Sequence, residues 1–228
     1  MPLRPTVRLV LAVSLDGRLA FPGGGPAQLG GAGDRQVLEQ ALAWADGCLM
    51  GAGTLRAHHC TCLIRESGLL EERAKAQRSP QPTACVVSRS ATPTFPEEWP
   101  FFQQPLERWL LHGEEASAPS AMPVGFSQRL AMGTTWQETL AQLAAQGMQR
   151  LVLLGGASLV ASCLRDDAVD DLQLTLTPRV VGGEHSWVPF DAAGLPPALA
   201  SSDAWLLQGA ERLQEDELVV RYQRRRSP

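Results

Sequence analysis

The sequence lacks three features that would each place the protein in a particular class. Its apolar run near the N-terminus, "VRLVLAV", is too short for a secretory signal, and no stretch is long enough to cross a membrane. The formal net charge is −4, so no overall basic charge favours binding to nucleic acid or to an anionic membrane. The five cysteines, an odd number without a signal peptide, do not form a disulfide framework and are expected to be reduced. We therefore expect a cytoplasmic protein that binds neither nucleic acid nor membrane.

The composition supports a folded, compact chain. Hydrophobic residues make up 44% of the 228 residues, which is enough for a well-buried core. We expect one domain over residues 1–228.

Short apolar runs alternate with helical patterns along most of the chain. The predicted strands are Val7–Val13, Cys48–Ala52, Thr83–Ser88, Arg108–His112 and Arg150–Gly155. The predicted helices are Asp34–Ala45, a segment within 134–147, and one that starts near Ser158. This alternation predicts an α/β fold with a mostly parallel sheet and crossover helices, and the continuous apolar character of the strands indicates burial on both faces.

The helix within 134–147 carries its own boundary signals. Thr134 or Thr135 can cap its N-terminus, and Glu138 completes a capping box from Thr135. Gly147 follows its last turn and is expected to end it.

The C-terminal third has a different pattern. "DLQLTLTP", part of "AWLLQGAERLQ" and "LVVRYQR" alternate apolar and polar residues, which predicts antiparallel strands at an edge of the sheet. Residues 89–105 and 113–123 are rich in Pro, Ser, Thr and Gln and are predicted to be surface loops. The closing "RRRSP" is predicted to be a solvated tail.

Glycines follow two of the predicted strands. Gly155 and Gly156 precede the helix that starts near Ser158, where close backbone approach, free N–H groups and the helix dipole would stabilise a phosphate. Gly51 and Gly53 follow the Cys48–Ala52 strand, with the hydroxyl of Thr54 just beyond them. A tight turn alone accounts for either pair, but ligands in α/β sheets bind outside the carboxyl ends of strands.

Two further strand ends carry polar groups. Ser88, Arg89 and Ser90 follow a buried strand, where hydroxyls and a guanidinium suit the 2′-phosphate of NADP. Asp16 follows the first strand, where its carboxylate would orient a polar ligand. An ordinary polar turn is the alternative interpretation of each of these segments.

His58, His59, Cys60 and Cys62 have the ligand types of a zinc site. All four lie within five residues, and the sequence has no second cluster, whereas structural zinc sites join two separated ligand pairs. We therefore expect no metal. "HGE" at 112–114 matches the histidine–glutamate half of a zinc deaminase but no Pro-Cys-x-x-Cys follows, which excludes deaminase activity.

Five segments in order, "LAVSLDGRLA", "LMGAGTLR", "VVSRS", "LLGGASLVASCL" and "AVDDLQLTLTPRVVGG", resemble the pyrimidine reductase of riboflavin biosynthesis. This is the reductase half of RibD proteins, a member of the dihydrofolate-reductase-like fold group, and the resemblance covers nearly the whole chain. It implies a mostly parallel sheet of about eight or nine strands with an antiparallel C-terminal edge and helices on both faces. It also implies NADPH as cofactor, bound in an extended cleft, and a homodimer.

The resemblance assigns roles to particular positions. Ala12 and Thr54 would lie near the nicotinamide, Ser88 and Arg89 near the adenosine phosphate, and the turn at 155–158 around the pyrophosphate. The full set assigned to the cofactor is Ala12, Gly51, Gly53, Thr54, Ser88, Arg89, Gly155, Gly156, Ala157, Ser158 and Leu159. Asp16 and Arg65 are assigned to the substrate.

The chain departs from the family pattern where the substrate would bind. The family reads Asp-Asp-Pro-x-Leu-Thr-x-Arg where this chain has "HHCTCLIR", so His58 and His59 replace two aspartates while Arg65 persists. The chain also has Leu154, Gln28 and Leu42 where the family has a glutamate, a tryptophan and an arginine. The identity of the substrate is therefore open.

In the family reaction, of the 5-amino-6-(5-phosphoribosylamino)uracil reductase type, hydride passes from the nicotinamide to C1′ of a phosphorylated ribosylamino-pyrimidine and opens the ribose. The protein must orient the substrate and assist one proton transfer. His58 and His59 are candidate catalytic groups because an imidazole exchanges protons near neutral pH, and Arg65 is a candidate for a bidentate phosphate contact. Exposed loop histidines, a reductase of another heterocycle, and a cofactor-binding protein without catalysis remain alternatives.

Overall fold

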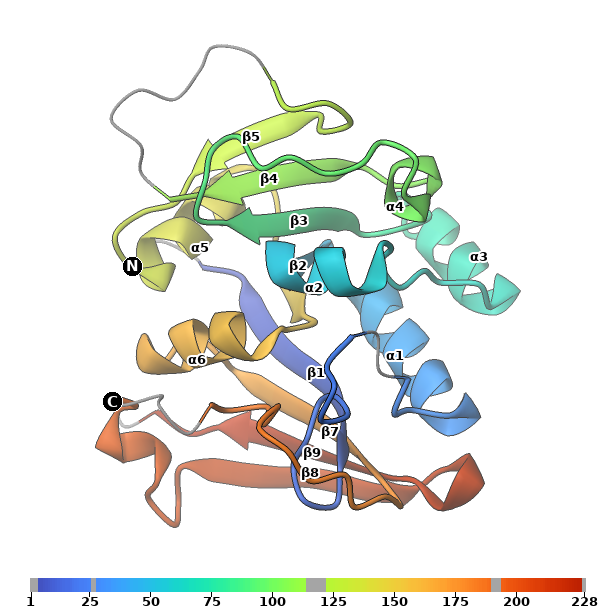
Figure 1. Ribbon diagram of the computed structural model, residues 1–228, viewed down its shortest axis with the longest axis vertical. Coiled ribbons are helices and arrows are strands. Elements are labelled where there is room, and N and C mark those ends of the chain that lie inside the picture. The colour runs from blue at the N-terminus through green and yellow to red at the C-terminus, as the bar shows by residue number, and fades with distance from the viewer. Residues whose placement is uncertain (1–3, 26–27, 114–121, 190–193, 227–228) are drawn as a thin grey trace. The chain divides into compact units, whose positions relative to one another are not determined.

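The computed structural model describes residues 4–25, 28–113, 122–189 and 194–226. Nine strands form a mostly parallel sheet with antiparallel C-terminal strands, and helices alternate with the strands along the chain (Figure 1). The α/β class, the strand number and the antiparallel C-terminal addition predicted from the sequence are confirmed. The chain divides into two compact units: Glu39–Val152 with the N-terminal residues through Pro5, and Thr6–Leu38 with Leu153–Pro228.

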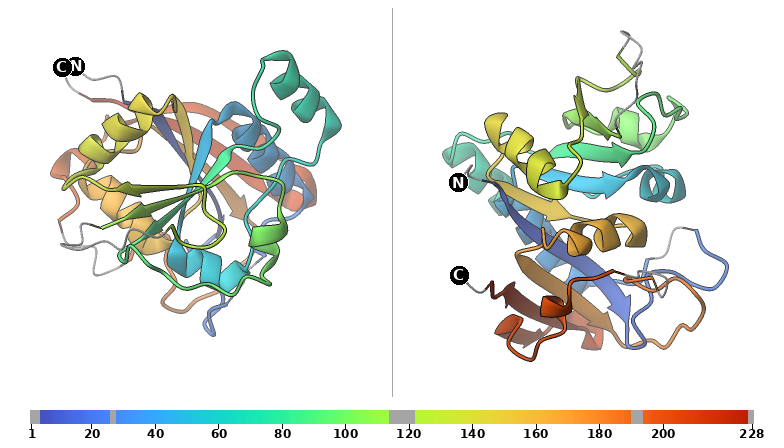
Figure 2. Two further views of the ribbon diagram at one scale, coloured as in Figure 1. Left: turned by 90° about the horizontal axis from the view of Figure 1, so that it is seen from above. Right: turned by 90° about the vertical axis from the view of Figure 1, so that its left-hand side faces the viewer.

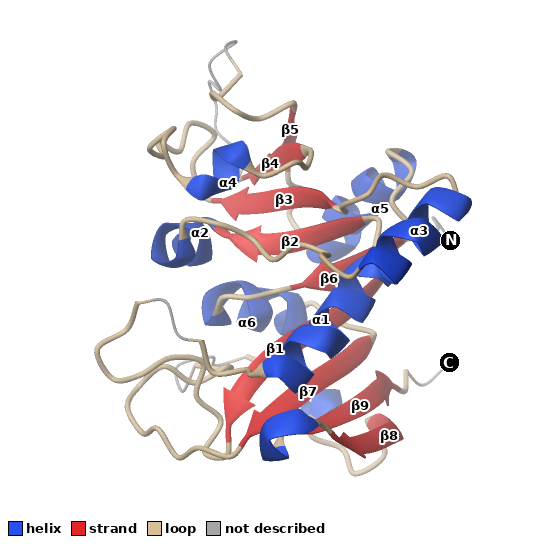
Figure 3. Ribbon diagram, turned by 90° about the vertical axis from the view of Figure 1, so that its right-hand side faces the viewer, coloured by secondary structure: helices blue, strands red, loops and turns tan. Residues whose placement is uncertain are grey.

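The first unit is built on a parallel group of strands, which lie side by side in Figure 3. In spatial order they are β2 (Gly47–Gly51), β3 (Thr83–Ser88), β4 (Arg108–His112) and β5 (Gln128–Ala131). The first three match predicted strands because their residues are apolar and almost wholly buried. β5 was not predicted, since its four residues are half-buried or exposed and form no apolar run. β6 (Arg150–Leu153) leads along the chain into the second unit.

The described helices of the first unit are α2 (Ala52–His58), α3 (Ser67–Lys75), α4 (Pro100–Gln103), α5 (Trp136–Ala145) and the second half of α1 (Ala32–Trp44). In the described ranges, no helix is both long and apolar enough to span a bilayer.

The boundary signals of α5 act as predicted, with one shift. The hydroxyl of Thr135 accepts the amide of Glu138 at 3.3 Å, and Gly147 follows the helix with a φ of 90°. The carboxylate of Glu138, however, accepts the amide of Thr134 at 2.8 Å rather than that of Thr135. Local hydrogen bonding therefore sets both ends of this helix.

The prediction of a surface loop over 89–105 was wrong in part. Residues 100–103 form α4, Phe101 is fully buried, and Phe95 is 8% exposed. The rings of Phe95, Phe101, Phe102 and Phe126 contact one another and form a small apolar cluster. The Pro-rich and Gln-rich composition concealed these aromatic side chains. Most of the other predicted loop, residues 114–121, lies outside the described residues.

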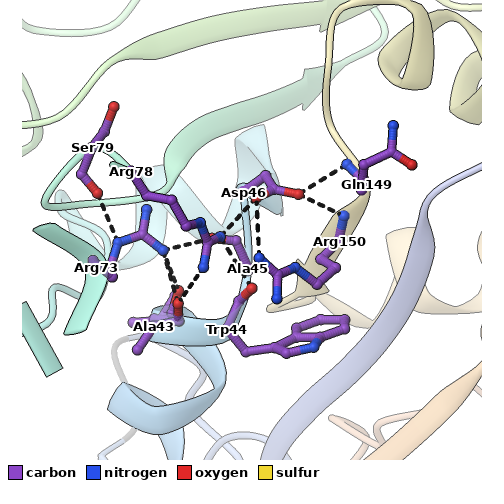
Figure 4. A network of polar contacts seen from close by, with 10 residues as sticks. Ala43, Trp44, Ala45, Asp46, Arg73, Arg78, Ser79, Gln149 and Arg150 are labelled. Atoms are coloured by element: carbon purple, nitrogen blue, oxygen red, sulfur yellow. Dashed lines mark hydrogen bonds and ion pairs between the residues drawn. The ribbon is translucent and has the colours of Figure 1, made fainter. Parts of the chain in front are cut away.

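Asp46 anchors the amino end of β2. Its carboxylate accepts the amides of Gln149 and Arg150 at 2.9 and 2.8 Å and pairs with Arg78 at 2.7 Å (Figure 4). Arg73, 3% exposed, donates to the carbonyls of Ala43 and Ala45 at 2.9 and 2.8 Å. Because the last carbonyls of a helix lack partners within the helix, the arginines complete the C-terminus of α1.

The second unit contains the antiparallel part of the sheet. Its strands are β1 (Thr6–Ser14), β7 (Asp171–Thr177), β9 (Leu218–Arg224) and β8 (Trp205–Arg212) in that order. β1 and β7 are parallel, whereas β7 with β9 and β9 with β8 are antiparallel. Its helices are the first half of α1, α6 (Ala157–Arg165) and the short turns η1 (Pro197–Leu199) and η2 (Gln214–Asp216).

Helices lie on both faces of β1 and β7. The side chain of Gln173 on β7 donates to the carbonyl of Val37 in α1 at 3.2 Å, which places the start of α1 on that face. Leu11 on β1 points to the other face, where it lies beside Gly155 at the turn into α6. The right-hand view of Figure 2 shows α6 in front of these strands. Helices on both faces, as predicted, are present in this unit.

The prediction that "RRRSP" is a solvated tail was wrong for its first residues. The side chain of Arg224 is 4% exposed and pairs with Asp167 at 2.9 Å. Arg226 pairs with Asp170 at 2.5 Å. Both aspartates follow α6, so these arginines hold the end of the chain against the turn between α6 and β7.

Candidate active site

The residues that the sequence marks as functional fall into two groups, one in each unit. The first unit holds Gly51, Gly53, Thr54, His58, His59, Arg65, Ser88 and Arg89. The second unit holds Ala12, Asp16, Gly155, Gly156, Ala157, Ser158 and Leu159. All of the glycines among them lie at the carboxyl end of a strand or in the turn or helix that follows it.

In the first unit, β2 ends at Gly51, which is also the residue before α2. No side chain caps the N-terminus of α2. A Cβ added to Gly53 would have no other atom within 4 Å, so the packing of the chain does not require glycine there. Thr54 lies half-buried in the first turn of the same helix. This strand end leaves open space directly beside exposed backbone.

The end of β3 lies at the same edge, because β2 and β3 are parallel and Gly51 is opposite Val87. Ser88 is 8% exposed, and its hydroxyl accepts the amide of Ser90 at 3.2 Å. The side chain of Arg89 is exposed and makes no ion pair within the described part of the chain. An unpaired guanidinium beside two serines has the chemistry to hold a phosphate group.

His58 and His59 have different environments. His59 follows α2 with a left-handed φ of 57°, and its ring stacks on that of Trp99 at 4.2 Å between centroids. Its carbonyl accepts the amide of Phe101 at 2.9 Å, so this residue is fixed on both its backbone and its ring. Burial, together with the neighbouring His59, lowers the pKa of His58. A neutral His58 imidazole has one donor and one acceptor nitrogen.

Three side chains, of which Gln81 and Glu39 are buried, hold the irregular segment 60–66. Gln104 bonds the amide and carbonyl of Thr61 at 3.0 and 2.7 Å, and Gln81 bonds those of Ile64 at 2.9 and 2.8 Å. Glu39, 7% exposed, accepts the amide of Arg65 at 2.7 Å. The backbone of Arg65 is thereby fixed while its side chain is exposed. No local signal identified these three residues, because each is separated from its partner by 17 to 43 positions.

The cysteines and the remaining histidines, His112 and His185, offer no metal site where the structure can be described. None of the five cysteines forms a disulfide, and burial raises the pKa of Cys48 to about 12. Across the described ranges, no group of three His, Cys, Asp or Glu residues is arranged to hold a metal ion. His112 is 4% exposed, with Nδ1 lying 2.6 Å from the carbonyl of Gly113.

In the second unit, Gly155 and Gly156 differ in what their backbones require. Gly155 is buried and has a φ of 92°, a conformation that favours glycine. Gly156 has a φ of −76°, which any residue adopts, and it precedes α6 without a side-chain cap. Ala157 and Ser158 form the first turn of α6, and Leu159 is 8% exposed. The uncapped helix N-terminus, with its positive dipole end, suits a phosphate.

Asp16 is engaged by the chain itself. Its carboxylate accepts the hydroxyl of Ser14 at 2.5 Å and the amides of Val181 and Gly182 at 3.0 and 2.7 Å. These hydrogen bonds, that from Ser14 first, hold the pKa of Asp16 well below its ordinary value. Asp16 thus ties the turn after β1 to the segment after β7, and its role as a substrate ligand stays a prediction.

The positions that depart from the family pattern offer no charged group. Leu42 is fully buried in α1, Leu154 is half-buried, and Gln28 is exposed. A substrate bound at these positions would therefore meet apolar or neutral side chains.

Comparison with known proteins assigns first a class and then a family. The solved structure of a dihydrofolate reductase from Enterococcus faecalis, complexed with NADP(H), matches with a TM-score of 0.54 and 13% identity, covering 99% of this chain and 100% of that one. The fold is therefore dihydrofolate-reductase-like. The chain belongs to the RibD C-terminal domain family, whose sequence profile matches residues 5–216. This is a pyrimidine reductase family, and its members typically use NAD(P)H.

Two further relatives agree with this family. A 2,5-diamino-6-ribosylamino-4(3H)-pyrimidinone 5′-phosphate reductase from Methanothermobacter thermautotrophicus is 27% identical over 228 residues, covering 96% of this chain and 98% of its own. A solved pyrimidine reductase-like protein from Corynebacterium diphtheriae matches with a TM-score of 0.79 and 19% identity, covering 98% of this chain and 93% of its own. The resemblance stated from the sequence motifs is confirmed.

Proposed function

We propose that this protein is an NADPH-dependent reductase that converts a ribosylamino-pyrimidine 5′-phosphate to its ribitylamino form. The observation that carries the proposal is the family match over residues 5–216. It is supported by the reductase from Methanothermobacter thermautotrophicus, which aligns with 96% of this chain. The uracil form of the substrate follows from the sequence motifs alone, whereas the name of that relative favours the 2,5-diaminopyrimidinone form, which we propose as the preferred substrate.

The residues present fit a phosphate-bearing cofactor. In the first unit, Gly53 leaves open space, and the exposed guanidinium of Arg89 suits the 2′-phosphate that distinguishes NADPH from NADH. In the second unit, the uncapped N-terminus of α6 after Gly156 suits the pyrophosphate. A Gly53→Ala variant should keep its stability, because a Cβ at this position contacts nothing, yet lose affinity for NADPH. Gly47→Ala is the control with the opposite expected effect on stability. Its added Cβ would lie 3.0 Å from the sulfur of Met148, so this variant should be less stable than native protein.

The chain supplies orientation and a hydrogen-bonding environment for the reaction. NADPH, when bound, supplies the hydride that reduces C1′ of the substrate. Arg65 holds the substrate phosphate, and Glu39 fixes the backbone from which its guanidinium extends. His58, kept neutral by burial and by His59, offers a donor or acceptor to the substrate. His59, stacked on Trp99, positions the end of α2 rather than moving a proton.

The test is a hydride-transfer assay with the purified protein, NADPH and each of the two ribosylamino-pyrimidine phosphates. We expect loss of NADPH absorbance and formation of the ribitylamino product, faster with the diaminopyrimidinone. Tight NADPH binding without turnover of either pyrimidine would instead indicate another heterocyclic substrate or a protein without catalysis.

We also propose that the chain acts as one reductase domain and forms a homodimer. An exposed edge supports the second part: β8 is the last strand of the second unit, and its Leu206 and Leu207 are 38% and 52% exposed. Apolar side chains on an unpaired edge strand favour association with another chain. Light scattering of the purified protein tests the dimer.

A further inference from the structure

Asp34 is a carboxyl group to which neither the sequence motifs nor the family resemblance assigns a role. It lies in the first turn of α1 and is half-buried, and the hydroxyl of Thr175 is its side-chain hydrogen-bond partner. Thr175 itself is 1% exposed, in the middle of β7. On its other side the carboxyl packs against Gly30, where an added Cβ would lie only 2.1 Å from Oδ2. The carboxyl is therefore packed between Thr175 and Gly30.

That place is defined by the register of the sheet. Thr175 pairs with Ala12 across β7 and β1, and Gln173 pairs with Val10. The side chain of Gln173 reaches α1, so Thr175, two residues further on, points to the same face. Ala12 is the residue that the family resemblance assigns to the nicotinamide end of the cofactor. The Asp34–Thr175 pair therefore lies beside the position at which hydride transfer is expected.

Two neighbouring carboxylates accept hydrogen bonds from backbone amides. Glu217, 2% exposed, accepts the amides of Gly31 and Asp34 at 2.6 and 2.8 Å, and Glu215 accepts that of Ala32 at 3.4 Å. These bonds satisfy the N-terminal amides of α1, which have no partner within the helix. Asp34 accepts no backbone amide among the described residues, so Asp34 is the carboxyl of this group that is left for another partner.

The surroundings of Asp34 raise the pKa of its carboxyl. Burial raises its pKa, and the hydrogen bond from Thr175 opposes that rise. The charge of Glu217 raises the pKa further, whereas Arg35 lowers it. An acid–base catalyst requires a pKa moved toward the pH at which it works, and a partly buried carboxyl beside a second carboxylate is moved in that direction.

We propose that Asp34 is a further catalytic residue, which donates the proton that the reduction requires. This inference rests on the proposed function. As the hydride adds to C1′ and the bond between C1′ and the ring oxygen O4′ breaks, the proton of the Asp34 carboxyl passes to O4′ and forms the 4′-hydroxyl. C1′ is reduced, the nicotinamide is oxidised, and the Asp34 carboxylate regains a proton from water. The chain has His58, His59 and Leu154 where the family has carboxylates, and Asp34 supplies an acidic group that those positions lack.

The experiment compares native protein with Asp34→Asn, which keeps the shape of the side chain and an oxygen for Thr175. We expect kcat to fall by about 100-fold or more, the range of general acid catalysis, with KM changed by less than about threefold. In native protein, kcat should fall as the pH rises through the pKa of Asp34. This descending limb of the pH–rate profile should be absent from Asp34→Asn. The pKa itself is measured by carboxyl 13C NMR on the cofactor-free protein and should lie above 3.8.

A second variant moves the carboxyl without removing it. In Gly30→Ala the new Cβ would meet Oδ2 of Asp34, so the carboxyl must shift, and kcat should fall while the 13C resonance of Asp34 changes. Gly209→Ala is the matched control, since a Cβ there has no neighbour within 4 Å, and it should behave as native protein. Thermal unfolding of all variants confirms that each is folded under the assay conditions.

Four outcomes would overturn the inference. Native kcat and an unchanged pH profile in Asp34→Asn would exclude a proton-donating role, and a rise in KM alone would make Asp34 a binding group. Loss of the pH-dependent limb in His58→Asn, with the limb intact in Asp34→Asn, would assign the proton to His58. Failure of native protein to reduce either pyrimidine would overturn the proposed function and this inference together, whereas an active native protein with an unaffected Asp34→Asn variant overturns this inference alone.

Discussion

The carboxylate of Glu39 accepts the backbone amide of Arg65 at 2.7 Å, and through this bond a buried residue of α1 fixes the position of an exposed arginine. The same carboxylate accepts the amide of Glu66 at 2.9 Å. With Gln81 and Gln104, it replaces the regular hydrogen bonding that segment 60–66 lacks. A buried carboxylate thus supports a segment that is assigned to substrate binding.

Removal of this support should affect the substrate more than the cofactor. In Glu39→Ala, the amides of Arg65 and Glu66 lose a charged acceptor, a change that costs about 1–3 kcal/mol for each group left unsatisfied. We expect lower stability and a KM for the phosphorylated substrate raised several-fold, with NADPH affinity close to native. Chemical denaturation and steady-state kinetics measure these effects. Glu71→Ala is the control, because Glu71 is 70% exposed and pairs with Lys75 on the surface of α3. The same rise in KM in this control variant would contradict the assignment.

Gly155 and Gly156 should separate folding from cofactor binding. Gly155→Ala forces a side chain into a left-handed conformation and should destabilise the protein by about 1 kcal/mol or more. Gly156 has an ordinary φ of −76°, so Gly156→Val should weaken NADPH binding by far more than it lowers stability. Thermal unfolding and NADPH titration on both variants test this. Unchanged NADPH affinity per folded Gly156→Val molecule would contradict the assignment of the cofactor pyrophosphate to this turn.

Arg89 should determine the preference for NADPH over NADH. Its exposed guanidinium would make a charge-assisted contact with the 2′-phosphate, a contact that contributes about 1.5–3 kcal/mol. Arg89→Ala should therefore lose about 10-fold to 100-fold in affinity for NADPH and little for NADH. Titration of both cofactors measures the ratio, with Arg165→Ala as an exposed arginine control of equal charge. Equal affinities for the two cofactors in native protein would contradict the assignment.

Asp16 should make stability depend on pH in the acidic range. Its pKa is lower in the folded protein than the ordinary value of 3.8, so the ionised carboxylate stabilises the fold above that pH. This contribution is lost as the pH falls from about 4 toward the lowered pKa. Asp16→Asn should consequently unfold at a lower temperature than native protein at pH 7. The difference in unfolding temperature between the two proteins should narrow only below about pH 4. Equal unfolding temperatures at pH 7 would show that the bonds to Val181 and Gly182 do not stabilise the fold.

The sequence by itself determined the features that depend on near neighbours in the chain. β2, β3 and β4 were predicted because buried parallel strands require continuous apolar residues, and α5 because Thr135 and Gly147 act within one turn of its ends. The glycines at the strand ends were found for the same reason, since a glycine after an apolar run is visible without knowledge of the fold.

Only the tertiary structure decided which distant groups meet. Glu39 and Arg65 are 26 positions apart, and Asp34 and Thr175 belong to different elements whose approach depends on the pairing of β1 with β7. The burial of Phe101 in a segment of polar composition has the same origin. Whether burial of a carboxylate or a ring stabilises the fold depends on the groups that surround it. Those groups come together only once the strands are paired and the helices are packed on them.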